Sequence, residues 1–127
     1  MPKEITTAVW IKNTQNNEWF DFLRLNLDAP YFSGNRKGVF MIWYVSPGKS
    51  RVIKIGSGIL ADQLKNIRTN PQVLDFTKNG PLKVSWVTIN GILKEEELLG
   101  VERYLYDTYS PLIGEKSLGD SIKINLL

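Results

Sequence analysis

The feature that most constrains this chain is a pair of strand-forming segments joined by a very short turn. Residues 38–45, GVFMIWYV, are aromatic and β-branched almost throughout, which is the strongest strand signal in the sequence. The turn segment SPGKS follows, and residues 51–56, RVIKIG, then alternate in character. Because the connection is so short, the two segments are predicted to form an antiparallel β-hairpin.

The second strand of this hairpin runs into Gly56-Ser57-Gly58. Glycine allows a sharp turn or a close approach to the backbone, and a serine can cap a helix that follows. We therefore predict a tight turn from strand to helix at this point. Within the strand, the alternation predicts that Lys54 faces outward or into a cleft.

Two later helices and one more strand are predicted from spacing. Leu60, Leu64 and Ile67 recur at helical spacing and predict an amphipathic helix over residues 59–68, and a further helical turn can follow Pro71. Residues 82–89, LKVSWVTI, predict a third central strand. Residues 93–109 predict a longer helix with one apolar stripe, formed by Leu98, Val101, Leu105 and Tyr109.

The N-terminal region adds a second predicted hairpin. Residues 6–12 read as one strand, and residues 19–27 alternate imperfectly, as the second arm of a hairpin attached to the sheet would. The expected fold is therefore α+β, with a small central antiparallel β-sheet flanked by helices and an extra N-terminal β-hairpin. A chain of 127 residues with 43% apolar content can form this as one domain.

The amino-acid composition excludes several kinds of catalytic and metal-binding site. The chain has no cysteine and no histidine, which excludes disulfides, thiolate metal sites and the commonest general base. It shows no segment of signal-peptide character and no apolar run approaching the roughly 18 residues that span a membrane. We therefore expect a soluble, cytoplasmic protein without a membrane partner.

Basic residues are concentrated in the middle of the chain. Residues 36–83 contain nine Lys/Arg and two acids, a net charge of +7, whereas the remainder carries −4. Such asymmetry is expected of a surface that faces phosphates, although an uneven scatter of surface lysines gives the same count. The candidate nucleic-acid-binding residues are Arg36, Lys37, Lys49, Arg51, Lys54, Lys65 and Arg68.

Glu102 interrupts the apolar stripe of the last helix, since it lies four residues after Leu98 and three before Leu105. Burial of a carboxylate without a partner is costly. Glu102 is therefore either a residue that reaches water or pairs with Lys or Arg, or a metal ligand.

The order of these segments resembles the GIY-YIG nuclease superfamily. In that family a Gly-Ile-Tyr strand precedes a Tyr-Ile-Gly strand, and Gly38-Val39-Phe40 and Lys54-Ile55-Gly56 occupy those places here. A later helix of the family supplies a glutamate followed by a proline, which Glu102 and Pro111 match. The resemblance covers residues 38–115, leaving residues 1–37 as an N-terminal extension and residues 116–127 as a tail.

The resemblance implies metal-dependent hydrolysis of phosphodiesters, with Mg²⁺ or Mn²⁺ held by the glutamate, a tyrosine that helps to activate water, and an arginine that stabilises phosphoryl charge. Several of these positions are substituted here. Phe40 has no hydroxyl, Lys54 replaces the second tyrosine, and Gly114 stands where the family commonly has asparagine. Lys54 is expected either to pair with an acid such as Glu102 or to contact phosphate.

The arginine position depends on the register of the helix. One alignment places Gln63 there and the other places Leu64, with Arg68 one turn later. Arg68 has a long side chain that can reach the site from this adjacent turn, although a displaced guanidinium is rarely equivalent. The candidate catalytic residues are therefore Glu102, Lys54 and Arg68, with Glu102 also the candidate metal ligand.

Three functions remain open from the sequence. The first is a divergent GIY-YIG-like domain that binds nucleic acid, most simply DNA, with weak or absent phosphodiester hydrolysis. The second is an active metal-dependent endonuclease with a substituted site that also uses Tyr44 or Tyr104. The third is a protein-interaction module with an exposed tryptophan anchor, although core packing is the simpler expectation for the tryptophans, which are Trp10, Trp19, Trp43 and Trp86.

Overall fold

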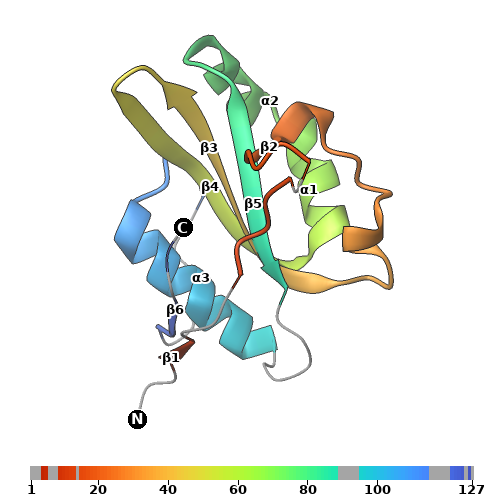
Figure 1. Ribbon diagram of the computed structural model, residues 1–127. Helices are drawn as coiled ribbons and strands as arrows, with labels where there is room; N and C mark the ends of the chain where they lie inside the picture. Colours follow the sequence, from red (N-terminus) through yellow and green to blue (C-terminus); the bar gives the residue numbers. More distant parts are fainter. Residues whose placement is uncertain are drawn as a thin grey trace.

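A four-stranded antiparallel sheet forms the centre of the molecule (Figure 1). The computed structural model describes residues 4–5, 9–13, 15–88, 95–114, 121–124 and 126. The sheet order is β2-β5-β3-β4, and all of its pairings are antiparallel. Its strands are β2 (Phe20–Asp21), β3 (Lys37–Ser46), β4 (Lys49–Ile59) and β5 (Leu82–Thr88). The predicted α+β class and central antiparallel sheet are therefore confirmed.

The hairpin of β3 and β4 is longer than its apolar segments suggested. Pairing runs from Lys37 opposite Ile59 to Ser46 opposite Lys49, so the turn contains only Pro47 and Gly48. Gly48 has a φ of +72°, a conformation that glycine adopts without steric cost. The predicted hairpin is confirmed, with β3 in the interior of the sheet and β4 at its edge.

The predicted turn at Gly56-Ser57-Gly58 is wrong, because β4 continues through these residues and α1 begins directly at Leu60. Gly56 lies opposite Phe40, and a Cβ built on Gly56 would lie 2.5 Å from the Cζ atom of that ring. The absence of a side chain therefore makes room for the phenyl ring. Ser57 does not cap α1, which has no side-chain hydrogen bond at its N-cap.

Helices cover both faces of the sheet (Figure 1). Helix α1 (Leu60–Arg68) packs on one face, and α2 (Pro71–Leu74) follows it, capped by the side chain of Asn70. Helix α3 (Glu95–Tyr109) packs on the opposite face. None of the helices among the described residues has the length and apolar character needed to cross a bilayer.

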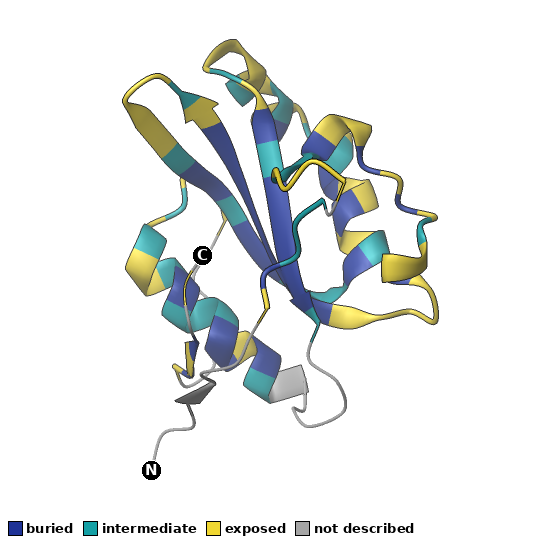
Figure 2. Cartoon of the chain, in the orientation of Figure 1, coloured by how far each residue is buried: buried dark blue, intermediate teal, exposed yellow. Residues whose placement is uncertain are grey.

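The core consists of two clusters, one on each face of the sheet, because successive residues of β3 point to opposite sides. Phe40 and Ile42 belong to the cluster beneath α1, whereas Val39 and Met41 belong to the cluster beneath α3. Figure 2 shows that buried residues dominate the central strands. The predicted stripe of α3 is confirmed, since Leu98, Val101 and Leu105 are buried and Tyr109 packs against them.

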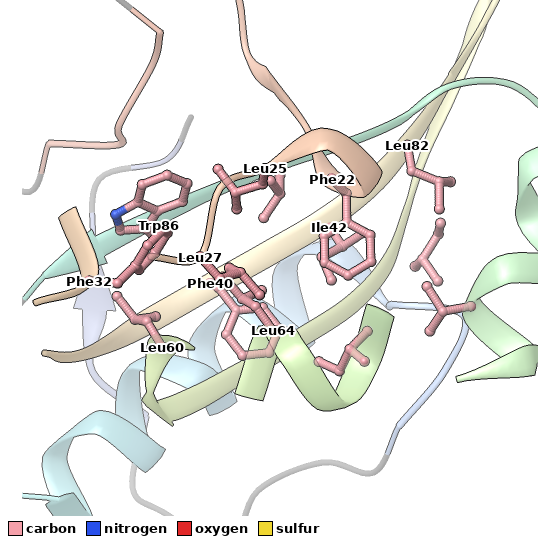
Figure 3. Packing of buried hydrophobic residues seen from close by; sticks show 14 of the residues in the cluster. Phe22, Leu25, Leu27, Phe32, Phe40, Ile42, Leu60, Leu64, Leu82 and Trp86 are labelled. Carbon is pink, nitrogen blue, oxygen red and sulfur yellow. The ribbon is translucent and has the colours of Figure 1, made fainter. Parts of the chain in front are cut away.

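The N-terminal region is attached to the sheet, but its second arm is not the strand that was predicted. Residues 19–27 form the two-residue β2 and then a 3-10 helix, η1 (Phe22–Arg24). A second 3-10 helix, η2 (Pro30–Phe32), follows. This turn away from the sheet edge lets Phe22 and Phe32 enter the cluster beneath α1, together with Leu25 and Leu27 (Figure 3).

The first arm of the predicted hairpin lies along β5 without forming a strand over residues 9–13. The Ile11 amide donates to the Trp86 carbonyl at 3.2 Å, and the Ser85 hydroxyl donates to the Ile11 carbonyl at 2.8 Å. An isolated bridge pairs Asn13 with Glu18. Residues 6–8, the start of the predicted strand, are outside the described residues.

After α3 the chain returns along the outer edge of β4. The amides of Leu112 and Ile113 donate to the carbonyls of Val52 and Ile53 at 3.2 and 2.8 Å. A separate parallel pair joins β1 (Glu4–Ile5) to β6 (Lys123–Ile124). The edge of β4 is thereby flanked by α3 and by residues 111–114, which is where the candidate site lies.

Candidate functional site

The site is built around Glu102 of α3, which lies against β4. Ser57 pairs with Val39, so its side chain points to the α3 face of the sheet. Its hydroxyl donates a hydrogen bond to Oε2 of Glu102 at 3.1 Å. The contact joins the strand end that precedes α1 to the middle of α3, and no residue pattern predicted it, because Ser57 was expected to cap a helix.

Lys54 of β4 lies at the same junction. Its side chain is half-buried, and a Cβ built on Gly114 would lie 2.9 Å from its Nζ atom. The ammonium group therefore lies directly against the backbone after α3. It also lies close enough to Glu102 to favour the ionised form of that carboxyl. Two of the three candidate catalytic residues, Lys54 and Glu102, are thus close enough to interact electrostatically. Among the described residues, however, no salt bridge joins them, so the expected ion pair is not formed.

The carboxyl group of Glu102 is perturbed by this environment. Burial raises the pKa of Glu102 above its ordinary value of 4.5, while the Ser57 hydrogen bond and the Lys54 charge lower it, and burial is the largest of the three effects. Glu102 therefore retains a proton to higher pH than an exposed glutamate does. Perturbed carboxyl groups of this kind are characteristic of functional sites, although structural networks also produce them.

Tyr106 completes the group of polar side chains at this junction. It lies one helical turn after Glu102, and its hydroxyl donates to the Gly114 carbonyl at 3.4 Å. Sequence reasoning missed Tyr106, although its spacing from Glu102 was the signal that could have identified it. We refer to these four residues, Lys54, Ser57, Glu102 and Tyr106, as the Glu102 cluster.

The tyrosines that were considered for the site lie elsewhere. Tyr44 is buried beneath α1 and stacks on Phe76, with ring centres 6.2 Å apart. Tyr104 packs against the core cluster under α3. Neither belongs to the Glu102 cluster.

Gln63 and Leu64, the two alternative occupants of the arginine position, have different surroundings. Leu64 is fully buried in the core beneath α1. Gln63 is exposed, and a Cβ built on Gly58 would lie 3.5 Å from its Nε2 atom. Of the two, Gln63 is therefore the one that places a polar group near the end of β4, next to Ser57.

Arg68 does not join the Glu102 cluster. It is the last residue of α1, and its guanidinium donates to the backbone carbonyls of Phe22 and Leu25, at 3.0 Å for Phe22. The same guanidinium lies over the Phe22 ring, 5.9 Å from its centre. The prediction that Arg68 reaches the site is therefore wrong, because the side chain fixes η1 on the face of the sheet opposite α3.

Phe40 is also unavailable as a reactive group. It is fully buried, in the cluster that also contains Leu60 and Leu64 of α1 and Phe22 of η1 (Figure 3). The N-terminal extension thus helps to fill the space next to the position where the resemblance implies a reactive tyrosine.

The basic residues of the middle segment do not form one continuous surface. Lys49 lies at the tip of the hairpin and Lys37 at its opposite end, about 30 Å away for a strand of this length. Lys83 pairs with Asp21 at 2.7 Å and Lys78 with Asp75 at 3.0 Å. The candidate binding residues that are exposed are Arg36, Lys37, Lys49 and Lys65, and those that are half-buried are Arg51, Lys54 and Arg68.

The donors at the site do not fit a resident divalent cation. Glu102 is the single carboxylate of the cluster, one of its oxygens accepts the Ser57 hydrogen bond, and the Lys54 ammonium lies nearby. Mg²⁺ and Mn²⁺ favour several oxygen donors, and a neighbouring cation opposes them. Across the described part of the chain, no group of three or more acidic side chains is arranged to hold a metal ion.

Comparison with known proteins gave no match to a protein-family model, to a curated protein or to a solved structure.

Proposed function

We propose that this chain is a divergent GIY-YIG-like domain that binds nucleic acid, most simply DNA, and hydrolyses phosphodiesters weakly or not at all. The observation that carries the proposal is the proximity of Lys54 and Glu102 at the junction of β4 and α3. These are the positions at which the resemblance expects reactive groups from the second motif strand and the later helix.

Binding is supported by the cations near this junction. The Lys54 ammonium lies beside the exposed backbone of Gly114, where a phosphate oxygen can approach it. Lys49 and Arg51 lie further along β4 and have no salt bridge to a described residue. A strand of nucleic acid that passes over residues 111–114, which cover the outer edge of β4, would therefore meet several positive charges in succession.

Three differences from the site that the resemblance implies support weak or absent catalysis. Phe40 has no hydroxyl and is fully buried, the Arg68 guanidinium is occupied by backbone carbonyls, and Glu102 alone offers little to a divalent cation. Removal of one charge-stabilising donor typically lowers a rate by about 100- to 1,000-fold, so loss of several reduces turnover severely.

One observation favours the active-nuclease alternative. The hydroxyl groups of Ser57 and Tyr106 and the carboxyl group of Glu102 lie together near Lys54. The protein-interaction alternative has less support, since Trp10, Trp43 and Trp86 are buried and Trp19 is half-buried.

The test combines binding and cleavage. We expect the wild-type protein to bind a labelled DNA with an affinity that falls steeply as salt rises, and Lys54→Gln to reduce the slope of log K against log salt by about 1. Lys78→Gln, at an exposed residue paired with Asp75, is the matched control and should change the slope little.

Cleavage of the same DNA is measured with Mg²⁺ and with Mn²⁺, with Glu102→Ala as the reference. Cleavage by the wild-type protein no greater than that of the variant supports the proposal. Cleavage well above the variant would establish the active-nuclease alternative, and absence of DNA or RNA binding at low salt would reject the proposed function.

A further inference from the structure

An aromatic hollow lies on the α3 face of the sheet, outside the Glu102 cluster. Its volume is about 360 Å³, within the range of small-molecule sites. It is formed where Trp19, the residue before β2, meets the two strands of the hairpin and the end of α3. Its described lining residues are Trp19, Trp43, Ser50, Arg51, Val52 and Tyr109.

Three rings supply flat walls to this aromatic hollow. Trp19 and Trp43 meet edge to face, with ring centres 5.6 Å apart and an interplanar angle of 82°. Tyr109 contributes the third ring from the last residue of α3. Trp19 and Tyr109 are half-buried, so each retains an accessible surface, whereas Trp43 is buried by the packing. Such an arrangement favours a planar aromatic guest, which can stack on one ring and touch the edge of another.

Two positively charged side chains lie at the aromatic hollow. Arg51 lines it, and the Lys12 ammonium lies 4.4 Å from the centre of the Trp19 ring. Its described lining includes no aspartate or glutamate. A planar guest attached to an anionic chain is therefore complementary to both its walls and its rim.

The position of the hollow relative to the Glu102 cluster specifies the guest further. Tyr109 follows Glu102 by seven residues on α3, which places both on the same side of the helix about 10 Å apart. Arg51 and Lys54 likewise belong to one strand, β4. A chain whose phosphate contacts Lys54 can thus extend over residues 110–114, which lead from Tyr109 to Gly114, and place a nearby base in the hollow.

We infer that the aromatic hollow binds an unpaired nucleobase, so that the protein recognises single-stranded nucleic acid in preference to duplex. The inference rests on the proposed function, which requires nucleic-acid binding but specifies no strandedness. A base in a duplex is stacked on both sides and cannot enter the hollow, whereas stacking on aromatic side chains accommodates any unpaired base.

The experiment measures affinity for a single-stranded DNA and for its duplex at the same salt concentration, together with quenching of tryptophan fluorescence. We expect tighter binding of the single strand, accompanied by quenching. Trp19→Leu and Tyr109→Leu should each weaken single-strand binding by about 5- to 150-fold and leave duplex binding nearly unchanged. Circular dichroism verifies that each variant is folded.

Tyr31→Leu is the matched control, because Tyr31 is a partly exposed ring that contacts Phe20 and Trp86 and does not line the hollow. It should leave the preference for single strands intact. Equal binding of both DNA forms, unaffected by Trp19→Leu and Tyr109→Leu, overturns the inference while the proposed function stands. Absence of binding to both DNA forms and to RNA at low salt overturns both the inference and the proposed function.

Discussion

The Ser57 hydroxyl donates to Oε2 of Glu102 at 3.1 Å, across a separation of 45 residues in the sequence. This contact links the end of β4 directly to the middle of α3. It also accounts for the unusual position of Glu102, whose side chain is half-buried beside the apolar stripe of α3 and still has a hydrogen-bond donor and a nearby cation. The cost of partial burial is thereby reduced without being removed.

The raised pKa of Glu102 predicts how its contribution to stability depends on pH. Because its pKa is higher in the folded protein than the ordinary 4.5, the folded state binds this proton more tightly. The associated stabilisation is fully present below pH 4.5 and is lost as pH rises through the raised value. We therefore expect Glu102→Gln, which cannot ionise, to be more stable relative to wild type at pH 7 than at pH 4.

The measurement is the difference in free energy of unfolding between wild type and Glu102→Gln, from urea titrations across this range. Asp62→Gln removes an exposed carboxyl in the first turn of α1 and serves as the control for a general charge effect. A stability difference between Glu102→Gln and wild type that stays constant with pH, or that changes in the opposite direction, would contradict a raised pKa of Glu102 in the folded protein.

Ser57→Ala should raise the pKa of Glu102 further, because it removes one of the two interactions that lower this pKa. The carboxyl carbon of Glu102 can be followed by NMR as pH is changed. Ser50→Ala, at an exposed serine near the hairpin tip, should leave the titration unchanged. A titration of Glu102 that is the same in Ser57→Ala and wild type would indicate that the hydrogen bond is not maintained in solution.

The sequence was sufficient to predict the elements whose pattern is local. The β-branched and aromatic run of β3, the spacing of Leu60, Leu64 and Ile67, and the apolar stripe of α3 each specify one element and its buried face. The position of Glu102 on that stripe identified it as a residue that required a partner.

The sequence was not sufficient where the deciding partner is distant. Gly56 and Gly58 resemble a turn in isolation. Within β4, the Phe40 ring on the neighbouring strand explains the glycine at 56, and a φ of +125° explains the glycine at 58. Arg68 resembles a functional residue for the same reason, since the carbonyls that bind it belong to residues 43 and 46 positions earlier. Non-local contacts of this kind have no periodic signature.

Arg68 is expected to support stability rather than nucleic-acid binding. Arg68→Met removes the hydrogen bonds to the Phe22 and Leu25 carbonyls and should lower the free energy of unfolding by about 1.5–3 kcal/mol. Arg24→Met, at an exposed residue of η1, is the control and should change it by about 0.5 kcal/mol or less. Urea unfolding provides the measurement, and DNA affinity is compared under conditions where both variants are folded. Loss of DNA affinity without loss of stability would restore Arg68 as a binding residue.

Gly56 and Phe40 are expected to be energetically coupled across the hairpin. A Cβ on Gly56 would lie 2.5 Å from Cζ of Phe40, so Gly56→Ala should cost about 1–3 kcal/mol of unfolding free energy through overpacking. Phe40→Leu shortens the obstructing ring and leaves a cavity, so it also destabilises the protein alone. In the double variant the added methyl group occupies part of the space released by the ring. The double-variant loss should therefore fall short of the summed single losses by about 0.5–3 kcal/mol.

A thermodynamic cycle from urea unfolding of the four proteins measures this coupling. Gly48→Asn in the hairpin turn is the comparison, because a Cβ there meets nothing within 4 Å and asparagine tolerates a φ of +72°. It should be uncoupled from Phe40→Leu, with losses that add. Strict additivity of Gly56→Ala and Phe40→Leu would mean that Gly56 is required for its backbone alone. The space beneath the phenyl ring would then not explain why β4 carries a glycine opposite Phe40.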